Sequence, residues 1–448
     1  MLTPQLAAAQ AQQAALARMP VVVELVAHLQ SDGFKFGRNV RLFGTQHLLA
    51  QTLGLCGALN ALGLSYDRMA LTGKAYSTHR ESVGHLRALG VRTPIARSYP
   101  LASSQAEEQV RDLASAAAEV RGTLAGEVSP LLLVIDDGGH ALTHARSWFP
   151  APCRIVGVEQ TASGFRQPGI AAVDFPTVDV AASAVKRHCE PAIVIDAVLQ
   201  RTGSLIDMWQ GGPVGVVGLG YIGMALCRRL AAAGVPLLVF DERADSFGTF
   251  TAVERTGSAF ELIDRCGLIL GCTGSDITRG FETDARERGL SSRSRTLISL
   301  SSGDSEFFTL RSMLLGAHAD STYAEGDIPD IAGSFASSPF VIRRNGFPIN
   351  FDNSAESAPL EQIQGTIAAL LAALCQAWSM ADQPHQARRT MLDPPFQQWL
   401  FERWDAHLAA SEGRGSRLSR ALIERLSEPR SDPQSTQHCS SFGSWTKA

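Results

Sequence analysis

The chain has 448 residues, which is enough for two or three domains with sizeable cores. It carries 40 lysine and arginine residues against 44 aspartate and glutamate residues, so its net charge of −4 does not indicate nucleic acid or an anionic membrane as a partner. Only four of the basic residues are lysines, namely Lys35, Lys74, Lys186 and Lys447. A lysine at a useful position is therefore more informative than usual in this chain.

Eight cysteines are scattered along the chain without a Cys-x-x-Cys pair. This spacing predicts a reduced, intracellular protein without a zinc framework. The first residues lack the basic start and apolar core of a signal peptide, and no apolar run approaches the length of a membrane span. We therefore expect a cytoplasmic protein with no membrane partner.

The first half of the chain alternates between helix-like and strand-like segments. Residues 1–31 predict one or two helices, and residues 39–43 predict a strand. His47 follows this strand and is expected in the first turn of a helix that Gly63 ends. The apolar run 131–135 predicts a buried strand that stops at two acids, Asp136 and Asp137. Ligands of open α/β sheets bind at the carboxyl ends of strands, so these side chains are candidates for a site.

The next elements continue this alternation. Residues 155–158 predict a strand that ends at Glu159 and Gln160. Residues 179–201 predict a mostly helical segment, which contains Lys186 and Glu190 and which Pro191 kinks or restarts. This pattern predicts an α/β fold with two Rossmann-like, doubly wound domains.

Residues 213–241 read as one strand–helix–strand unit with a dinucleotide-binding turn. A β-branched run at 214–217 meets the sequence Gly-Leu-Gly-Tyr-Ile-Gly of residues 218–223. In such a turn the first glycine allows the bend, the second lets the backbone approach a pyrophosphate, and the third lets helix and strand pack closely. Asp241 closes the second strand, where a carboxylate binds ribose hydroxyls and repels a 2′-phosphate. The unit predicts NAD as the cofactor.

Beyond Asp241 the alternation continues to a long apolar helix at 360–380. Two more strands, at 268–274 and 296–300, end in or run into small polar residues and glycine, which suit close approach to a cofactor. Residues 340–346 predict a hairpin that leads to Asn350. From about residue 411 the chain is rich in Ser, Arg, Gln and Pro, and this composition predicts a disordered tail over 411–448.

Several short motifs, in the same order, make the stretch from about His47 to Leu371 resemble the S-adenosylhomocysteine hydrolase family. The motifs that carry the resemblance are the helix-opening segment 47–52, Ile135–Gly139, Glu159–Gly164, Lys186 with an acid four residues later, and Asp304–Glu306. The resemblance implies an enzyme that holds NAD tightly and oxidises a ribose 3′-type hydroxyl of a nucleoside-like substrate. The ketone would acidify the neighbouring C–H and permit elimination or hydrolysis at C5′.

The resemblance also implies roles for individual residues. Lys186 would take the hydroxyl proton, Glu190 would tune Lys186, and Asp137 and His47 would manage protons at C4′ and C5′. Gln160, His79 and Gln51 would contact the substrate. The residues expected to hold the cofactor are Gly218, Gly220, Tyr221, Ile222, Gly223, Asp241, Thr161, Ser163, Thr273, Gly274, Ser301, Ser302 and Asn350.

Other positions depart from the family pattern. They are Gln160 for a ribose-binding glutamate, Glu190-Pro191 for Asp-Asn, Ile195 for a cysteine, Ser302 for a histidine, Ala358-Pro359 for His-Pro, and Leu49 and Gln51 for adenine-side groups. The family's basic, tyrosine-bearing terminus is also absent. Because most of the cofactor residues are kept and most of the adenosine residues are not, ordinary adenosylhomocysteine hydrolysis is not expected.

Two other functions stay open. The first is an ordinary dehydrogenase with exchangeable NAD, and the second is a non-catalytic NAD-binding protein whose tail engages a partner. His140 and His144 lie four residues apart, but no third ligand accompanies them, so no metal is expected. We expect a substrate domain at 1–200, completed by 350–410, and an NAD domain at 205–349. The resemblance favours a homo-oligomer, a dimer or a tetramer.

Overall fold

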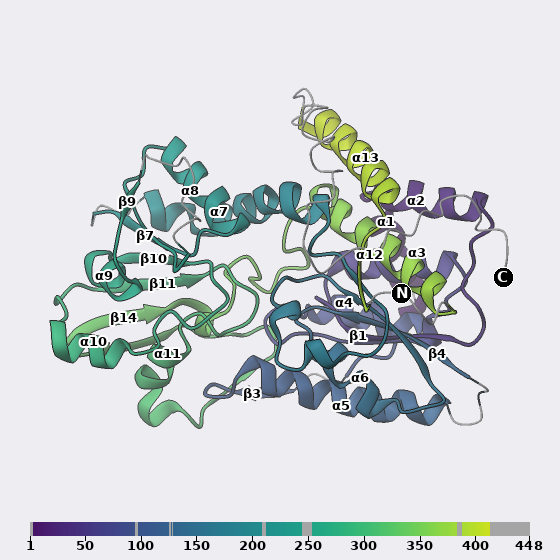
Figure 1. Cartoon of the computed structure of the whole chain (residues 1–448), viewed down its shortest axis with the longest axis horizontal. Coiled ribbons are helices and arrows are strands. Elements are labelled where there is room, and N and C mark those ends of the chain that lie inside the picture. Colours follow the sequence, from purple (N-terminus) through teal and green to yellow (C-terminus); the bar gives the residue numbers. More distant parts are fainter. Residues whose placement is uncertain are drawn as a thin grey trace. The chain divides into compact units, whose positions relative to one another are not determined.

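The computed structural model of the chain describes residues 3–94, 97–124, 127, 129–207, 212–243, 253–382 and 388–412 (Figure 1). The chain forms two compact units. Unit 1 consists of Met1–Ile95, Gln109–Glu190 and Ala358–Ala448, and unit 2 consists of Ala96–Glu108 and Pro191–Ser357. The inclusion of residues 96–108 in unit 2 is a feature that the sequence did not predict.

Unit 1 is built on a six-stranded sheet in the order β15-β6-β5-β4-β1-β2. All its neighbouring strands are parallel. The strands are β1 (Val40–Thr45), β2 (Met69–Thr72), β4 (Leu131–Asp136), β5 (Arg154–Glu159), β6 (Thr177–Asp179) and β15 (Arg389–Met391). Counted along the chain, the order is 2-1-3-4-5-6, which is the doubly wound order of flavodoxin-like sheets. The strand order reverses between β1 and β4.

Helices cover both faces of this sheet, which explains why β2 and β4 are buried along their whole length. α12 (Leu360–Met380) packs on β5 and β6, and α2 (Pro20–Ser31) and α3 (Ala50–Ala61) pack against α12. On the opposite face, side chains of α5 (Gln105–Leu124) and α6 (His140–Trp148) join Phe43, Val134 and Ile155 in one apolar core. The remaining helices are α1 (Pro4–Ala17), α4 (Arg80–Leu89) and α13 (Pro394–Glu412).

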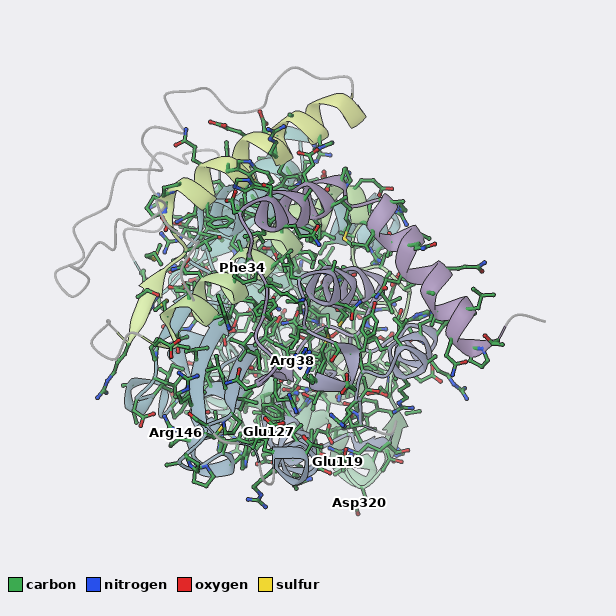
Figure 2. All side chains as sticks on the ribbon, turned by 90° about the vertical axis from the view of Figure 1, so that its right-hand side faces the viewer. Phe34, Arg38, Glu119, Glu127, Arg146 and Asp320 are labelled. Carbon is green, nitrogen blue, oxygen red and sulfur yellow. The ribbon has the colours of Figure 1, made fainter. Side chains whose placement is uncertain are left out.

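α12 is the one described helix whose length and apolar composition would allow it to cross a membrane. Within its most apolar stretch of 18 residues, 83% is buried in the protein. Figure 2 views unit 1 from the side on which Arg38 and Glu127 lie. These residues precede β1 and β4, so this side is the amino-terminal edge of the sheet. The carboxyl ends of the strands lie at the other edge. The tail predicted at 411–448 falls, from residue 413 onward, outside the described residues.

Unit 2 contains a seven-stranded sheet in the order β13-β14-β11-β10-β7-β8-β9. The strands are β7 (Val214–Val217), β8 (Leu237–Phe240), β9 (Glu254–Arg255), β10 (Leu268–Gly271), β11 (Arg295–Ser299), β13 (Ile331–Phe335) and β14 (Ser338–Ile342). All pairs are parallel except β13 with β14. From β9 to β14 the order is 3-2-1-4-5-6, the Rossmann order. The predicted fold class is confirmed.

The helices of unit 2 are α7 (Glu190–Asp207), α8 (Tyr221–Ala232), α9 (Ala259–Arg265), α10 (Phe281–Arg288) and α11 (Phe308–Leu315). Side chains of α7 and α8 pack on β7, β8, β10 and β11 in one apolar core. A short antiparallel pair, β3 (Ser98–Pro100) with β12 (Thr322–Ala324), joins the segment 96–108 to this unit.

The hairpin predicted at 340–346 is wrong in position. The hairpin is formed by β13 and β14, and its turn is Ala336-Ser337, where φ is 48° and 65°. Both central residues are left-handed, which is the geometry of a two-residue hairpin turn. Neither residue is the glycine or asparagine that usually signals such a turn, so the turn could not be recognised from its residues. Residues Arg343–Gly346 form a tight turn instead, in which Arg344 and Asn345 have φ of 48° and 51°.

Candidate functional site

Four polar side chains gather where β1, β2, β4 and β5 end at the carboxyl edge of the unit 1 sheet. His47 follows β1, Lys74 follows β2, Asp137 follows β4 and Gln160 follows β5. These strands are neighbours in the sheet, and the reversal of strand order lies between β1 and β4. Ligands of doubly wound sheets bind at such a reversal. We refer to these four residues as the Asp137 cluster.

Asp137 is the centre of the cluster because its carboxylate contacts all three other side chains. Oδ1 accepts a hydrogen bond from the ammonium of Lys74, and Oδ2 accepts one from the amide of Gln160. Nε2 of His47 lies 3.1 Å from Oδ2. Asp137 is 2% exposed, Lys74 5% and Gln160 4%, so the ion pair and its hydrogen bonds are shielded from water.

The protonation states of Asp137 and Lys74 follow from this arrangement. Burial alone would raise the pKa of Asp137, but the charge of Lys74 and the contact with His47 outweigh burial and hold that pKa well below its usual range. Burial alone would lower the pKa of Lys74, yet Asp137 raises it above the ordinary value. Both groups are therefore charged near neutral pH.

His47 uses both ring nitrogens. Nε2 faces Asp137, and Nδ1 lies 2.6 Å from the hydroxyl of Ser77. The sequence placed His47 in the first turn of a helix, but α3 begins at Ala50 and His47 lies in the loop before it. The loop position lets the ring turn toward Asp137 instead of following the helix surface.

Two further acids lie behind the cluster. Asp136 accepts the backbone N–H groups of Asp137 and Leu142, both at 2.9 Å, and burial raises its pKa to about 7. Glu159 accepts the backbone and hydroxyl groups of Thr161, both at 2.6 Å. Burial, with the neighbouring Asp136 charge, raises the pKa of Glu159 well above its usual value. The site therefore holds acids in opposite protonation states, a feature typical of functional sites.

Lys186 and Glu190 form a second pair on the same unit. Lys186 lies in the π-helical segment Val185–Cys189 that follows β6, and its Nζ is 2.7 Å from Oε1 and 2.5 Å from Oε2 of Glu190. The hydroxyl of Thr366 lies 3.3 Å from Oε2 of Glu190. The predicted pairing of Lys186 with Glu190 is thus present, and π-helical turns are frequent at functional sites.

The other candidates of unit 1 have simpler surroundings. His79 caps α4, since its Nδ1 accepts the backbone N–H of Ser82 at 3.4 Å. Gln51 is 5% exposed in α3, and its amide oxygen has no hydrogen-bond partner among the described residues. The hydroxyl of Thr161 accepts Ser163 Oγ at 3.1 Å and donates to Glu159. Thr161 and Ser163 therefore shape the loop that follows β5.

In unit 2 the glycine-rich turn follows β7, and the strand order reverses between β7 and β10. Gly218 has φ +94°, which favours glycine. A Cβ on Gly223 would lie 1.8 Å from the carbonyl oxygen of Gly218, so only glycine fits there, whereas nothing lies within 4 Å of a Cβ on Gly220. The turn is tight at its base and open at Gly220, where a pyrophosphate would approach α8. This geometry agrees with the predicted NAD-type cofactor.

Asp241 organises the same turn from the end of β8. Its carboxylate accepts the backbone N–H of Leu219 at 2.6 Å and that of Arg243 at 2.8 Å. The Arg243 guanidinium also pairs with it at 3.3 Å. Asp241 thus joins the second strand to the glycine turn, in the position predicted for ribose recognition.

The end of β10 is fixed by Glu306. Its Oε1 accepts the backbone and hydroxyl groups of Thr273, both at 2.9 Å, and its Oε2 accepts the backbone N–H of Gly274 at 2.8 Å. The hydroxyl of Ser301 accepts the same Gly274 N–H at 2.9 Å. The predicted residues Thr273, Gly274 and Ser301 are therefore brought together.

The remaining cofactor candidates lie near the same strand ends. Tyr221 and Ile222 open α8, and Tyr221 is 55% exposed. Ser302 is exposed in the loop after β11, and Asn350 is buried beside the end of that strand, where Ile349 donates to Ser299 at 3.1 Å.

The sequence assigned no role to four residues of these sites, Lys74, Asp136, Glu159 and Glu306, although the three acids lie in segments that it singled out. Lys74 had a usable signal, because it is one of four lysines and follows a strand directly after a glycine. Asp136 and Glu159 end apolar strands, and Glu306 lies in the loop after β11, but nothing in the sequence shows that a carboxylate will be buried. In the part of the chain that the structure describes, no group of three or more His, Cys, Asp or Glu side chains could hold a metal ion.

No protein-family model matches the chain. Two uncharacterized proteins of Mycobacterium tuberculosis, from the CDC 1551 / Oshkosh and the ATCC 25618 / H37Rv strains, are each 28% identical to it over 362 residues. The match covers 78% of this chain and 67% of each relative.

Among solved structures, an NADPH-dependent glyoxylate/hydroxypyruvate reductase from Sinorhizobium meliloti, in complex with NADP and malonate, has a TM-score of 0.38 at 16% identity and covers 62% of this chain and 87% of its own. A dipicolinate synthase polypeptide from Bacillus halodurans has a TM-score of 0.36 at 12% identity, and the match covers 61% of this chain and 87% of its own. D-lactate dehydrogenase from Aquifex aeolicus, complexed with NAD and lactic acid, has a TM-score of 0.26 at 15% identity, and the match covers 42% of this chain and 61% of its own. At these identities and scores the likenesses fix neither substrate nor activity.

Proposed function

We propose that the protein is an NAD-dependent oxidoreductase that oxidises a secondary hydroxyl of a nucleoside-like substrate, of the ribose 3′ type, with tightly held NAD. The observation that carries the proposal is the Asp137 cluster, in which a buried carboxylate, a buried lysine and a histidine lie at the strand reversal of unit 1. Proton transfer to and from a hydroxyl requires such groups. When bound, the nicotinamide supplies the hydride acceptor.

In this proposal the Lys186–Glu190 pair and the Asp137 cluster carry out different proton transfers. Lys186, as a neutral amine, takes the proton of the substrate hydroxyl, and Glu190, whose oxygens lie 2.5 and 2.7 Å from its Nζ, holds the ammonium that forms. His47 exchanges a proton at the carbon next to the new ketone, where acidity is raised. Asp137 accepts three donors already, so its part is to hold His47, Lys74 and Gln160.

The residues of unit 2 fit an NAD molecule. The N–H groups at the start of α8 suit a pyrophosphate, because the N-terminus of a helix favours an anion. The open side of Gly220 leaves room for it, and Asp241 suits a ribose with free hydroxyls better than one with a 2′-phosphate. Thr273, Gly274 and Ser301, held by Glu306, line the next strand end.

The surroundings of Gln160 support a substrate other than adenosylhomocysteine. In the family this position carries a glutamate, which grips the ribose hydroxyls. Here the amide of Gln160 donates to Asp137, which a glutamate carboxylate could not do without a proton. Gln160 therefore serves the cluster, and substrate recognition at this position differs from that of the family.

The test begins with the purified protein. We expect it to retain NAD through gel filtration, as shown by mass spectrometry of the nucleotide released on denaturation. Addition of nucleosides, one at a time, should then produce the absorbance of reduced nicotinamide in an amount that follows the protein concentration and not added NAD. Lys186→Met should abolish this signal and keep the bound NAD, while Lys35→Met, the same change at an exposed lysine, should preserve both.

Other outcomes would replace the proposal. Free NADH that accumulates with substrate would show an ordinary dehydrogenase with exchangeable cofactor. Bound NAD with no redox change across the nucleoside panel would leave a non-catalytic NAD-binding protein. The homo-oligomer expected from the sequence stays a prediction, which light scattering of the purified protein would test.

A further inference from the structure

The most unusual group in unit 1 is a buried lysine for which the sequence predicted no role. Lys74 is 5% exposed and follows β2 directly after Gly73. Its ammonium lies against Asp137 and 5.7 Å from the centre of the Tyr76 ring. A buried ion pair stabilises a fold poorly compared with apolar packing, so its presence at the carboxyl edge of the sheet suggests a functional reason.

The functional reason for the ion pair concerns His47, which contacts Asp137. A carboxylate beside a histidine ordinarily stabilises the protonated imidazolium, because opposite charges attract. An imidazolium cannot accept a proton, so an unpaired Asp137 would make His47 a poor base. Lys74 neutralises Asp137 from the other carboxylate oxygen and removes this effect, while Oδ2 still accepts the N–H of His47.

The hydrogen bonds of His47 then select one tautomer. An ionised Asp137 is only an acceptor, so Nε2 of His47 must carry a proton. In a neutral ring Nδ1 is then an acceptor, and the hydroxyl of Ser77, 2.6 Å away, donates to it. Ser77 and Lys74 come from the same loop after β2, in which the backbone N–H of Ser77 donates to the carbonyl of Lys74 at 3.0 Å.

We propose that Lys74 is a positioning residue that keeps His47 neutral, with its proton on Nε2 and with Nδ1 unprotonated and accepting the Ser77 hydroxyl, which is the state that a base requires. Lys74 acts through Asp137. The proposal deepens the proposed function, since it rests on proton exchange at His47. The other groups that bear on this ring are Tyr76, whose ring centre is 6.0 Å away, and Asp136 and Glu159 behind Asp137.

The test is ¹⁵N NMR of the holoprotein with labelled histidine, and it needs no substrate. Eleven histidines contribute signals, and His47→Gln identifies those of His47. At neutral pH the native protein should show a protonated Nε2 and an unprotonated Nδ1. In Lys74→Met the unprotonated Nδ1 signal should be lost, because Asp137 then takes the imidazolium as its counter-ion. Lys35→Met, which removes an exposed lysine, should leave the native signals.

Each result decides the proposal. An unprotonated Nδ1 in Lys74→Met would overturn it. So would a doubly protonated His47 in the native protein, which settles the matter even if the variant does not fold. The double variant Lys74→Met/Asp137→Asn, which removes both charges of the ion pair, should show both neutral tautomers; retention of the single native tautomer would overturn the step in which Asp137 selects it. Native signals as proposed, in a protein inactive on nucleosides, would reject the proposed function and keep this inference.

Discussion

Nε2 of His47 lies 3.1 Å from Oδ2 of Asp137, although the two residues belong to loops after different strands. β1 and β4 are neighbours at the point where the strand order of unit 1 reverses, which is where ligands of doubly wound sheets bind. The first prediction depends on this contact.

His47→Gln should lower nucleoside-dependent turnover by about 10²- to 10⁴-fold, the usual contribution of an acid–base group. Bound NAD should stay unchanged, because His47 belongs to unit 1 and the glycine turn to unit 2. The measurement is stopped-flow absorbance together with nucleotide content. Glutamine keeps a hydrogen-bonding side chain of similar length, so a variant that folds and turns over at the native rate would remove His47 from the mechanism.

Asp137→Asn should destabilise the protein by about 3–5 kcal/mol, because Lys74 would be left buried without a counter-charge. The double variant Lys74→Met/Asp137→Asn should recover a large part of this loss, since it removes both charges. Urea unfolding of the two variants and the native protein gives the comparison. Equal losses in the single and the double variant would show that the ion pair does not set the stability of this region.

Two glycines of the turn after β7 should respond differently to alanine. Gly223→Ala should destabilise the protein by about 1–3 kcal/mol, because the new Cβ meets the carbonyl of Gly218. Gly220→Ala should leave thermal stability unchanged, since nothing lies within 4 Å of its Cβ, and should weaken NAD binding by closing the approach to α8. Calorimetry of the apoprotein and NAD titration separate the two effects. Retained NAD affinity in Gly220→Ala would place the cofactor elsewhere.

Asp241→Asn should reduce the preference for NAD over NADP by about tenfold, or about 1.4 kcal/mol, because the charge that repels a 2′-phosphate is removed. Asparagine keeps an oxygen for the N–H of Leu219, so the turn should survive. The measurement is the ratio of dissociation constants for NAD and NADP in the apoprotein. An unchanged ratio would show that Asp241 does not face the adenosine ribose.

Asp136 should make stability fall as pH rises. Its pKa in the folded protein is about 7, above the ordinary value of 3.8, so the neutral form is favoured by folding. The stabilisation is complete at pH below the ordinary pKa and is lost as pH rises to about 7, with a slope of up to about 1.4 kcal/mol per pH unit. Asp136→Asn should flatten this slope in urea unfolding. Asp320→Asn, at the exposed aspartate marked in Figure 2, should not.

Much of the fold could be predicted from sequence because it rests on local patterns. The bounds of β7 and α12 were predicted to the residue, since an apolar β-branched run and helical periodicity mark them. The glycine turn was predicted with its acid because the spacing of Gly218, Gly220 and Gly223 is itself the mechanical requirement of the bend. The hairpin at Ala336-Ser337 was missed because its left-handed turn lacks the usual residues.

The candidate site was predicted only in part. Asp137 and His47 were proposed as site residues from the ends of strands, and the link between Lys186 and Glu190 was proposed from the family resemblance. The place of Lys74 on Asp137 could not be predicted, since strand order decides which loops become neighbours and the sequence does not state that order. The same holds for Glu306, which is remote in sequence from the Thr273 and Gly274 that it holds.

By itself the sequence determined the alternation of strands and helices, the dinucleotide turn and the scarcity of lysine. These depend on interactions between residues close together in the chain. Only the tertiary structure decided that Lys74, His47, Asp137 and Gln160 form one cluster and that Asp136 and Glu159 are buried behind it. Charge states in a protein depend on burial and on neighbours across the sheet, and neither exists until the strands have assembled.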